Sequence, residues 1–313
     1  MTRQGSRLIV VPLDGSRAAA AALSAARTLS HPTGTVLHAL HVSRRRLPPD
    51  QLPAALGMPP DHLSDVILDQ AVGQPEQEIP RTASVLGAEL IVITTHGSTH
   101  DLARVAGHVT LSVIQGASCP VLVIRTALGP AGAEKLSRAR RILVPLDGSP
   151  ESTACVGHAA ELARWNDAEL CFLHVATVAR KVSGGGAMLS APRYLDQPYL
   201  EMEAWSEEFM ARCLCFEREA RLDVRPHLFL SRGEPATEIV RFATEHACDL
   251  IAAAWGGSLG GERAAVVKSL LERAPCPLLF LRAALSEWQS PPRESAGTEP
   301  RQVSFSPLRL PQP

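Results

Sequence analysis

One peptide occurs twice in this chain, and that repetition constrains the fold more than any other feature of the sequence. The first copy, RLIVVPLDGS, ends at Ser16, and the second, RILVPLDGS, ends at Ser149. Asp147 therefore stands 133 residues after Asp14 (147 − 14). Repeat units of about 20 to 50 residues stack into solenoids, whereas a unit of more than about 100 residues is the size of a domain. The repeat predicts two homologous domains in tandem.

Apolar, β-branched runs alternate with segments of helical periodicity in the first copy. We expect strands at 8–12, 35–42, 66–68, 91–94 and 121–124, and helices at 17–29, 76–86 and from about 107 to 116. Strands that are apolar along most of their length are buried on both faces, as in parallel sheets covered by crossover helices. The pattern predicts an α/β fold in which each copy forms a doubly wound, Rossmann-like parallel sheet. The proline-rich segment 48–60 leaves little room for a helix.

Three further markers recur in the same order and locate where the copies differ in length. They are His41-Val42 with His174-Val175, Gly73-Gln74-Pro75 with Gly233-Glu234-Pro235, and Cys119-Pro120 with Cys276-Pro277. Their offsets are 133, 160 and 157 residues. The second copy therefore has 27 more residues between its second and third strands (160 − 133), which include a helical-looking segment at 205–221. It has three fewer in the loop after its fourth strand (160 − 157).

The repeats and the segments around them divide the chain into four parts. The first domain is expected at residues 1–127 and the second at 140–284. Between them, residues 126–140 are small, polar and turn-rich, so we expect a linker at 128–139. The tail, residues 285–313, is rich in Pro, Ser, Arg and Glu, a composition typical of disorder.

Composition argues against several classes of partner. The formal net charge is −1 and the pI is about 6.8, so no electrostatic attraction to nucleic acid or to a membrane surface is expected. The seven cysteines form no Cys-x-x-Cys pair, which fits a reduced compartment. No stretch of about 18 apolar residues is present, and the first apolar run is too short for a signal peptide. A cytoplasmic location is therefore expected.

A glycine-bearing loop separates the fourth strand of the first copy from its last helix. His96-Gly97-Ser98 ends the strand, and Gly107 lies at the start of the helix. A loop that leads to a helix N-terminus can bind phosphate, because unpaired N–H groups and the positive end of the helix dipole face it. Two glycines ten residues apart also serve turn geometry alone, so the pattern by itself leaves both interpretations open.

Taken together, the markers resemble those of the universal stress protein family over residues 7–125 and 140–282. They are the Val-Pro-Leu-Asp-Gly-Ser turn, the His-Val strand end, the Gly-x-Pro helix start and the Cys-Pro strand start. The resemblance implies a five-stranded parallel sheet of the adenine nucleotide alpha hydrolase type in each copy. For nucleotide-binding members it also implies an ATP-binding loop of pattern Gly-x2-Gly-x9-Gly-Ser/Thr.

The residues implied by this resemblance lie in the first copy, where the loop pattern falls on Thr94, Gly97, Gly107 and His108. The spacing is kept, but Thr94 adds a Cβ where the ribose would lie, and His108 replaces a small hydroxyl by an imidazole. The other implied nucleotide contacts are Pro12, Asp14 and Val42 around adenine and ribose, and Val109 and Thr110 at the triphosphate. Asp14 is expected to hold the turn and to cap the helix whether or not a nucleotide binds.

The corresponding loop of the second copy, residues 254–265, is three residues short of the pattern and ends in Ala264-Ala265. We therefore expect no phosphate cradle there. Trp255 is expected to pack over the mouth of the vacated pocket, with stacking on a base as the alternative. A small-anion nest is a further alternative for the glycines of this loop, which are Gly256, Gly257, Gly260 and Gly261.

Three functions are weighed for this sequence. The first is a regulatory, stress-response protein whose first domain binds ATP or another adenine nucleotide. The second is a scaffold or dimerisation module without a ligand. An ATPase or phosphotransferase is the third, and an enzyme is not expected because the chain has no Gly-x4-Gly-Lys-Ser/Thr loop. No metal site is predicted, since His96, His100 and His108 are interpreted as solvent-facing residues.

The final strands of the two copies lead to a prediction about assembly. Strands at 121–124 and 278–281 are expected to pair edge to edge, which covers backbone that each domain alone would expose. One chain would then mimic a homodimer of single domains. A further homodimer of the whole chain and an unidentified protein partner stay open.

Overall fold

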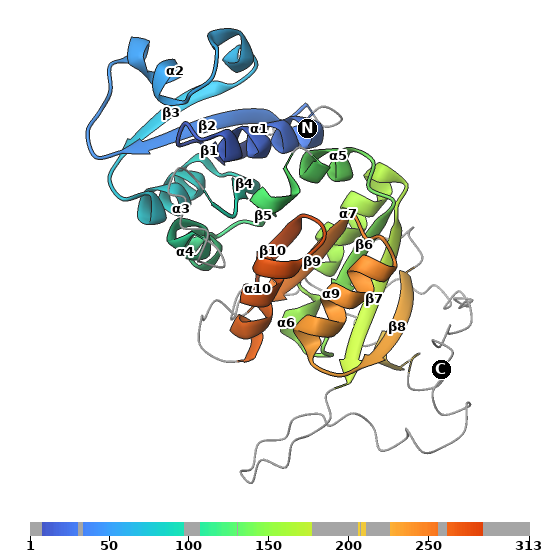
Figure 1. Ribbon diagram of the computed structural model, residues 1–313. Helices are drawn as coiled ribbons and strands as arrows, with labels where there is room; N and C mark the ends of the chain where they lie inside the picture. The colour runs from blue at the N-terminus through green and yellow to red at the C-terminus, as the bar shows by residue number, and fades with distance from the viewer. Residues whose placement is uncertain are drawn as a thin grey trace, which may run out of the picture.

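The computed structural model describes residues 8–30, 34–96, 107–129, 131–176, 206, 208–210, 226–255 and 262–283. Within these ranges ten strands form one sheet (Figure 1). The first copy supplies β1 (Leu8–Pro12), β2 (Val36–Ser43), β3 (Ile67–Val72), β4 (Leu90–Thr94) and β5 (Val121–Ile124). The second supplies β6 (Arg141–Pro145), β7 (Glu169–Ala176), β8 (Pro226–Arg232), β9 (Leu250–Trp255) and β10 (Leu278–Arg282). The strand order is β3-β2-β1-β4-β5-β10-β9-β6-β7-β8.

Helices cover both faces of this sheet, and each face has its own hydrophobic core that runs through both domains. The helices of one face are α1 (Arg17–Ser30), α5 (Ala131–Ser137) and α7 (Val156–Asn166). Those of the other face are α3 (Pro75–Leu86), α4 (His108–Gly116), α9 (Pro235–Glu245) and α10 (Glu262–Arg273). The short α6 (Pro150–Thr153) precedes α7. The predicted α/β class, with parallel strands inside each copy, is confirmed.

Local sequence explains why these segments take these forms. Alanine lines the buried face of α1, so the helix approaches the sheet closely, and Leu23 is almost fully buried among those alanines. Helix α3 begins with Pro75 at its first position, where the missing N–H has no helical partner to lose. It ends at Gly87, whose φ of 66° is left-handed and is accessible to glycine without strain.

The two domains join through their last strands, as the sequence predicted. β5 and β10 pair antiparallel, with Leu122 opposite Leu279. The guanidinium of Arg125 reinforces the junction by donating to the carbonyl oxygens of Leu271, Glu272 and Ala274, which lie at the C-terminal end of α10. These backbone carbonyls have no helical partner of their own, so a cation there satisfies them and meets the negative end of the helix dipole.

Two segments differ from the sequence prediction. Residues 126–140, expected as a turn-rich linker, contain a 3₁₀ turn, η3 (Thr126–Leu128), and helix α5. Helix α5 has only seven residues and so depends on tertiary packing: Leu136 is buried, and a Cβ on Gly132 would lie 3.1 Å from Ile124 Cγ2. The proline-rich segment also holds short helices, η1 (Pro49–Gln51), α2 (Leu52–Ala55) and η2 (Pro60–Leu63). Its prolines occupy first-turn positions, where proline is tolerated.

Several sequence predictions concern residues outside the described ranges. These are Gly97, His100, the glycines between 256 and 261, most of the segment 205–221 and the tail 285–313. Ser206 and residues 208–210 of that segment are helical. Among the helices of the described ranges, none combines the length and the hydropathy needed to cross a bilayer.

Candidate functional site

The sheet of the first domain opens where β1 and β4 part. Their ladder has two residue pairs and ends at Val10 opposite Ile91, although β1 continues to Pro12 and β4 to Thr94. Beyond that point each strand follows its other neighbour: Leu13 N donates to Leu40 O of β2, and Thr95 N donates to Ile124 O of β5. Helix α1, which follows β1, covers one face of the sheet, whereas α4, which follows β4, covers the other. This reversal is expected at the topological switch point of a doubly wound sheet. We call the surrounding residues, 12–14, 94–96 and 107–110, the fork.

A tight turn places Asp14 on one side of the fork. Its Oδ1 accepts a hydrogen bond of 3.0 Å from Ser16 N, and its side chain is exposed. Gly15 has a φ of 80°, and a Cβ there would lie 2.6 Å from Ala55 O, so only glycine fits this position. The N-cap of α1 is Ser16, whose Oγ accepts from Ala19 N at 3.1 Å. The predicted turn role of Asp14 is confirmed, whereas the helix cap belongs to Ser16.

Threonines hold the other side of the fork together. Thr110 is buried, and its hydroxyl donates to Thr94 O at 2.8 Å, which ties the first turn of α4 to the end of β4. Gly107 N donates to Thr95 O at 2.7 Å. Thr95 Oγ1 in turn accepts from Thr126 N at 3.0 Å. These bonds fix where α4 begins relative to the sheet.

The N-terminus of α4 is left open toward this side of the sheet. Gly107 is its N-cap and carries no side-chain cap, and the first intrahelical bond runs from Leu111 N to Gly107 O. In the described part of the chain, the N–H groups of His108, Val109 and Thr110 therefore have no helical acceptor, which is the arrangement that binds anions. A Cβ on Gly107 would lie 3.3 Å from Thr95 O, so glycine permits this close approach.

Neither unusual residue of the loop pattern blocks the fork. Thr94 is buried and turns its hydroxyl to His96 O at 2.9 Å, while His108 is exposed. Pro12 and Val42, at the ends of β1 and β2, are partly exposed. The residues present thus fit a nucleotide whose phosphates meet α4. Sequence reasoning missed Thr95 and Ser16; the only signal for Ser16 was its place in the repeated Asp-Gly-Ser turn.

Comparison with known proteins decides the family. A family model described as the universal stress protein family matches residues 5–125 and, a second time, residues 138–282. The chain belongs to the universal stress protein family.

Individual relatives agree with this assignment. A universal stress protein of Methanocaldococcus jannaschii is 29% identical over 151 residues, which cover 47% of this chain and 85% of the relative. The universal stress protein YxiE of Bacillus subtilis is 27% identical over 147 residues, covering 45% of this chain and 98% of the relative. The crystal structure of a universal stress protein from Archaeoglobus fulgidus has a TM-score of 0.63 at 15% identity, covering 89% of this chain and 99% of that one. The last match spans both domains and supports the fold.

The second domain of this universal stress protein repeats the strand geometry of the first. The β6–β9 ladder also has two residue pairs and ends at Leu143 opposite Ile251. Ser149 N donates to Asp147 Oδ1 at 2.9 Å, so the turn after β6 matches the turn after β1.

Aromatic side chains distinguish this second site from the first. Phe209 is buried beside the turn, with its ring 4.9 Å from that of His174 and within 3.2 Å of where a Cβ on Gly148 would lie. Trp255 corresponds to Thr95 at the 160-residue offset and is 1% exposed, within the core of that face. Trp255 was predicted to pack over the mouth of the pocket, but the structure places its side chain deeper, in the hydrophobic core. Nothing in the sequence signalled Phe209, because it lies in the insertion that has no counterpart in the first copy.

Burial controls the chemistry of the titratable groups near the core. Loss of solvent lowers the pKa of His174, whose Nδ1 lies 2.9 Å from Leu146 O. Burial raises the pKa of the Cys119 thiol to about 11 and those of Cys248 and Cys276 to about 12. These free thiols are protonated at neutral pH and act as packing residues rather than nucleophiles. In the ranges that the structure covers, no three His, Cys, Asp or Glu side chains gather in a way that could hold a metal ion.

Proposed function

We propose that the first domain binds an adenine nucleotide, ATP, at the fork, and that its occupancy regulates the interaction of this universal stress protein with a protein partner. The observation that carries the proposal is the N-terminus of α4, which no side chain of the described residues caps, beside the point where β1 and β4 part. Ligands of doubly wound sheets bind outside the carboxyl ends of the strands at such a switch point. Phosphate is the anion that helix N-termini commonly bind.

We propose a separate role for the residues on each side of the nucleotide. Pro12 and Val42 would contact the adenine, and the exposed carboxylate of Asp14 would accept hydrogen bonds from the ribose hydroxyls. The N–H groups of His108 and Val109 would meet the phosphates. We assign the Thr110 hydroxyl to the protein and not to the triphosphate, because it donates to Thr94 O.

We propose that the second domain does not bind ATP. Phe209 packs against the turn that matches Asp14-Gly15-Ser16, and Trp255 replaces a small threonine at the end of β9. Trp255 adds apolar volume at a position that the first domain leaves to a polar residue, whereas Phe209 packs on Gly148 where the α2 segment packs on Gly15 in the first domain. The expected stoichiometry is therefore one nucleotide per chain.

A ligand-free scaffold is the second candidate function. It is favoured by the β5–β10 pairing, which builds a dimer-like sheet within one chain without help from a nucleotide. We propose binding rather than catalysis for the fork, because the family resemblance brings no catalytic residue with it. The described cysteines are free, which fits a reducing, cytoplasmic environment.

Calorimetric titration of ATP tests the proposal with a matched pair of variants. In Asp14→Asn, the amide oxygen can still accept from Ser16 N, so the turn is preserved while the carboxylate is lost. We expect wild type to bind with a Kd in the micromolar range, and Asp14→Asn to bind about tenfold or more weakly. Asp147→Asn, the same change in the second domain, is the control and should leave the affinity unchanged.

A third variant probes the phosphate end. Gly107→Ala adds a Cβ 3.3 Å from Thr95 O, which must displace the first turn of α4 slightly, and we expect a weaker ATP affinity. The absence of binding heat in wild type would reject the nucleotide and favour the scaffold. Release of phosphate from ATP clearly above a protein-free blank would favour an ATPase instead.

A further inference from the structure

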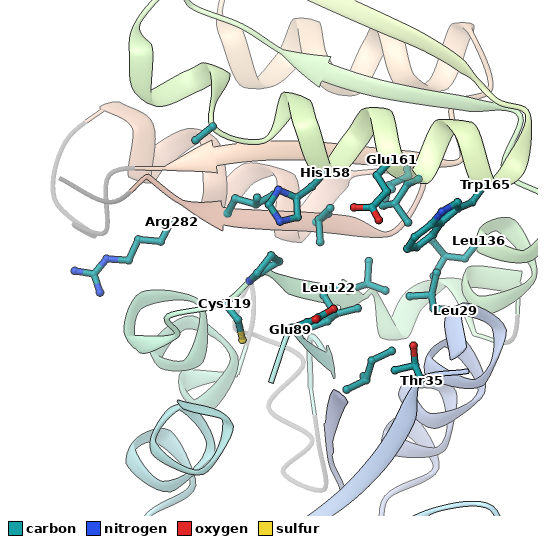
Figure 2. A pocket seen from close by; sticks show the side chains of 18 of the residues that line it. Leu29, Thr35, Glu89, Cys119, Leu122, Leu136, His158, Glu161, Trp165 and Arg282 are labelled. Carbon is teal, nitrogen blue, oxygen red and sulfur yellow. The ribbon is translucent and has the colours of Figure 1, made fainter. Parts of the chain in front are cut away.

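A second site lies at the opposite end of the strands from the fork. A cavity of about 550 Å³ opens between the amino ends of β1, β4 and β5 in the first domain and helix α7 of the second (Figure 2). Its volume falls within the range of about 300 to 1,000 Å³ that is typical of small-molecule pockets. Because both domains line it, the cavity exists only in the tandem arrangement.

The two ends of the β5–β10 pairing differ in their contacts. On the other side of the junction, Arg125 donates to carbonyls at the end of α10, and Lys135 of α5 donates to Pro275 O at 3.1 Å. Arg282 is the counterpart of Arg125 at the 157-residue offset, yet among the described residues it makes no such bond. Its side chain borders the cavity and its guanidinium extends away from it (Figure 2). This side of the junction is therefore not filled by the contacts that close the other.

The cavity has apolar walls and two carboxylates. Its floor is built from buried leucines of the sheet, among them Leu122 and Leu279, which face each other in the β5–β10 pairing. Figure 2 shows Glu161 on α7 and Glu89 before β4 on opposite sides of the space. The indole of Trp165, which is 43% exposed, adds an aromatic surface at one end.

Among the lining residues that the structure describes, the charge balance is negative. Both carboxylates already interact with other groups of the chain, Glu161 with His158 among them, but a carboxylate offers about four acceptor sites and can accept a further donor. Arg282 directs its charge outward. His158 keeps an exposed edge, and desolvation by its apolar surroundings lowers its pKa, so the imidazole adds no positive charge at neutral pH.

We propose that this cavity binds a small amphipathic cation, an alkyl- or arylammonium compound whose apolar body fills the leucine-lined space and whose ammonium group lies between Glu89 and Glu161. Ammonium groups bind carboxylates through charge-assisted hydrogen bonds and are also attracted to the face of an indole ring. The site is separate from the fork, since one lies at the amino ends of β1 and β4 and the other at their carboxyl ends.

Three probes with one carbon skeleton test the charge preference: 4-phenylbutylamine, 4-phenylbutanol and 4-phenylbutyrate, each titrated against the full chain by calorimetry. We expect the amine to bind at least tenfold more tightly than the alcohol, and the carboxylate to bind most weakly. Glu89→Gln and Glu161→Gln should each weaken amine binding about tenfold, since each removes one charged hydrogen-bond acceptor. Glu272→Gln, which removes an exposed carboxylate outside the cavity, should have no effect.

A variant that fills the cavity tests the site without changing its charge. Ala154 lines the cavity and is exposed, so Ala154→Phe should fill the space without disturbing the core and abolish amine binding, with thermal unfolding as the check on folding. The proposal is overturned if the amine does not bind, if all three probes bind alike, or if its affinity is unchanged in Glu89→Gln, Glu161→Gln or Ala154→Phe. Asp14→Asn should leave amine binding intact, so failure of the nucleotide proposal would be distinguishable from failure of this one.

Discussion

At the scale of single residues, the two domains use equivalent positions for different purposes. Thr95 at the end of β4 accepts a hydrogen bond from Thr126 N and belongs to the polar network of the fork. Its counterpart Trp255 is 1% exposed, and its indole Nε1 has no hydrogen-bond partner within the described part of the chain. A buried, unpaired donor costs about 1 to 3 kcal/mol, which the large apolar area of the ring must offset.

Replacing Trp255 separates these two contributions. Trp255→Phe removes the unpaired donor together with some apolar area, so we expect a change in the free energy of unfolding within about 1 kcal/mol. Trp255→Ala leaves a cavity and should cost about 3 to 5 kcal/mol. Urea unfolding at equilibrium measures both. Equal destabilisation by the two variants would mean that the indole N–H has a partner.

The residues of the fork were predictable from the sequence to different degrees. Asp14 and Gly107 stood at positions set by the repeat and by the loop spacing, and the structure places both at the fork. The sequence did not reveal that the Thr110 hydroxyl donates a hydrogen bond to Thr94 O, because the two residues lie 16 positions apart and meet only in the folded chain. Phe209 could not be found either, since no local pattern links it to Gly148.

At the scale of secondary-structure elements, a close backbone contact connects α2 to the turn at the fork. A Cβ on Gly15 would lie 2.6 Å from Ala55 O, and a Cβ on Gly57 would lie 2.6 Å from Gly15 O. The short helix therefore rests directly on the turn that carries Asp14. This contact explains why a proline-rich segment of no evident helical pattern adopts a fixed structure here.

Two glycine substitutions test that contact. Gly15 and Gly34 both have left-handed φ values, of 80° and 64°, but a Cβ on Gly34 would meet nothing within 4 Å. Gly34→Ala should therefore show only the backbone cost of about 1 to 2 kcal/mol. Gly15→Ala adds a clash with backbone, and we expect it to cost at least about 1 kcal/mol more. Similar unfolding midpoints for both variants would show that α2 does not press on the turn.

Element positions were the most predictable feature of the chain. The β-branched run before His96 placed β4 to within one residue, because a strand buried on both faces needs such a run. Helix α5 was not predicted, because its seven residues lie in a segment that carries turn-favouring glycine and proline. Its stability comes from Leu136 and Ala133, which are buried against α1 and the sheet.

At the scale of the whole molecule, the antiparallel β5–β10 pairing turns two five-stranded sheets into one. The pairing covers a strand edge on each domain that would otherwise be free to associate with other chains. Arg125, at the end of β5, donates hydrogen bonds across the junction to carbonyl oxygens at the end of α10. Its counterpart Arg282, at the end of β10, is exposed. Desolvation at the junction lowers the pKa of Arg125.

The same substitution at the two equivalent arginines tests this difference. Arg125→Lys removes the planar group that reaches three carbonyls at once, and we expect it to lower the free energy of unfolding by about 1 to 3 kcal/mol. Arg282→Lys should change it by less than about 0.5 kcal/mol, as surface substitutions commonly do. Thermal and urea unfolding compare them. Equal effects would contradict the asymmetry of the junction.

The proposal that only the first domain binds a nucleotide is tested most directly by the number of ATP molecules bound per chain. Equilibrium dialysis of radiolabelled ATP at saturating concentration gives the number bound per chain for wild type, Asp14→Asn and Asp147→Asn. We predict one ATP per chain in wild type and in Asp147→Asn, and a titration shifted to higher ATP concentration in Asp14→Asn. Two ATP molecules per chain, or a site that is weakened by Asp147→Asn and not by Asp14→Asn, would contradict the account.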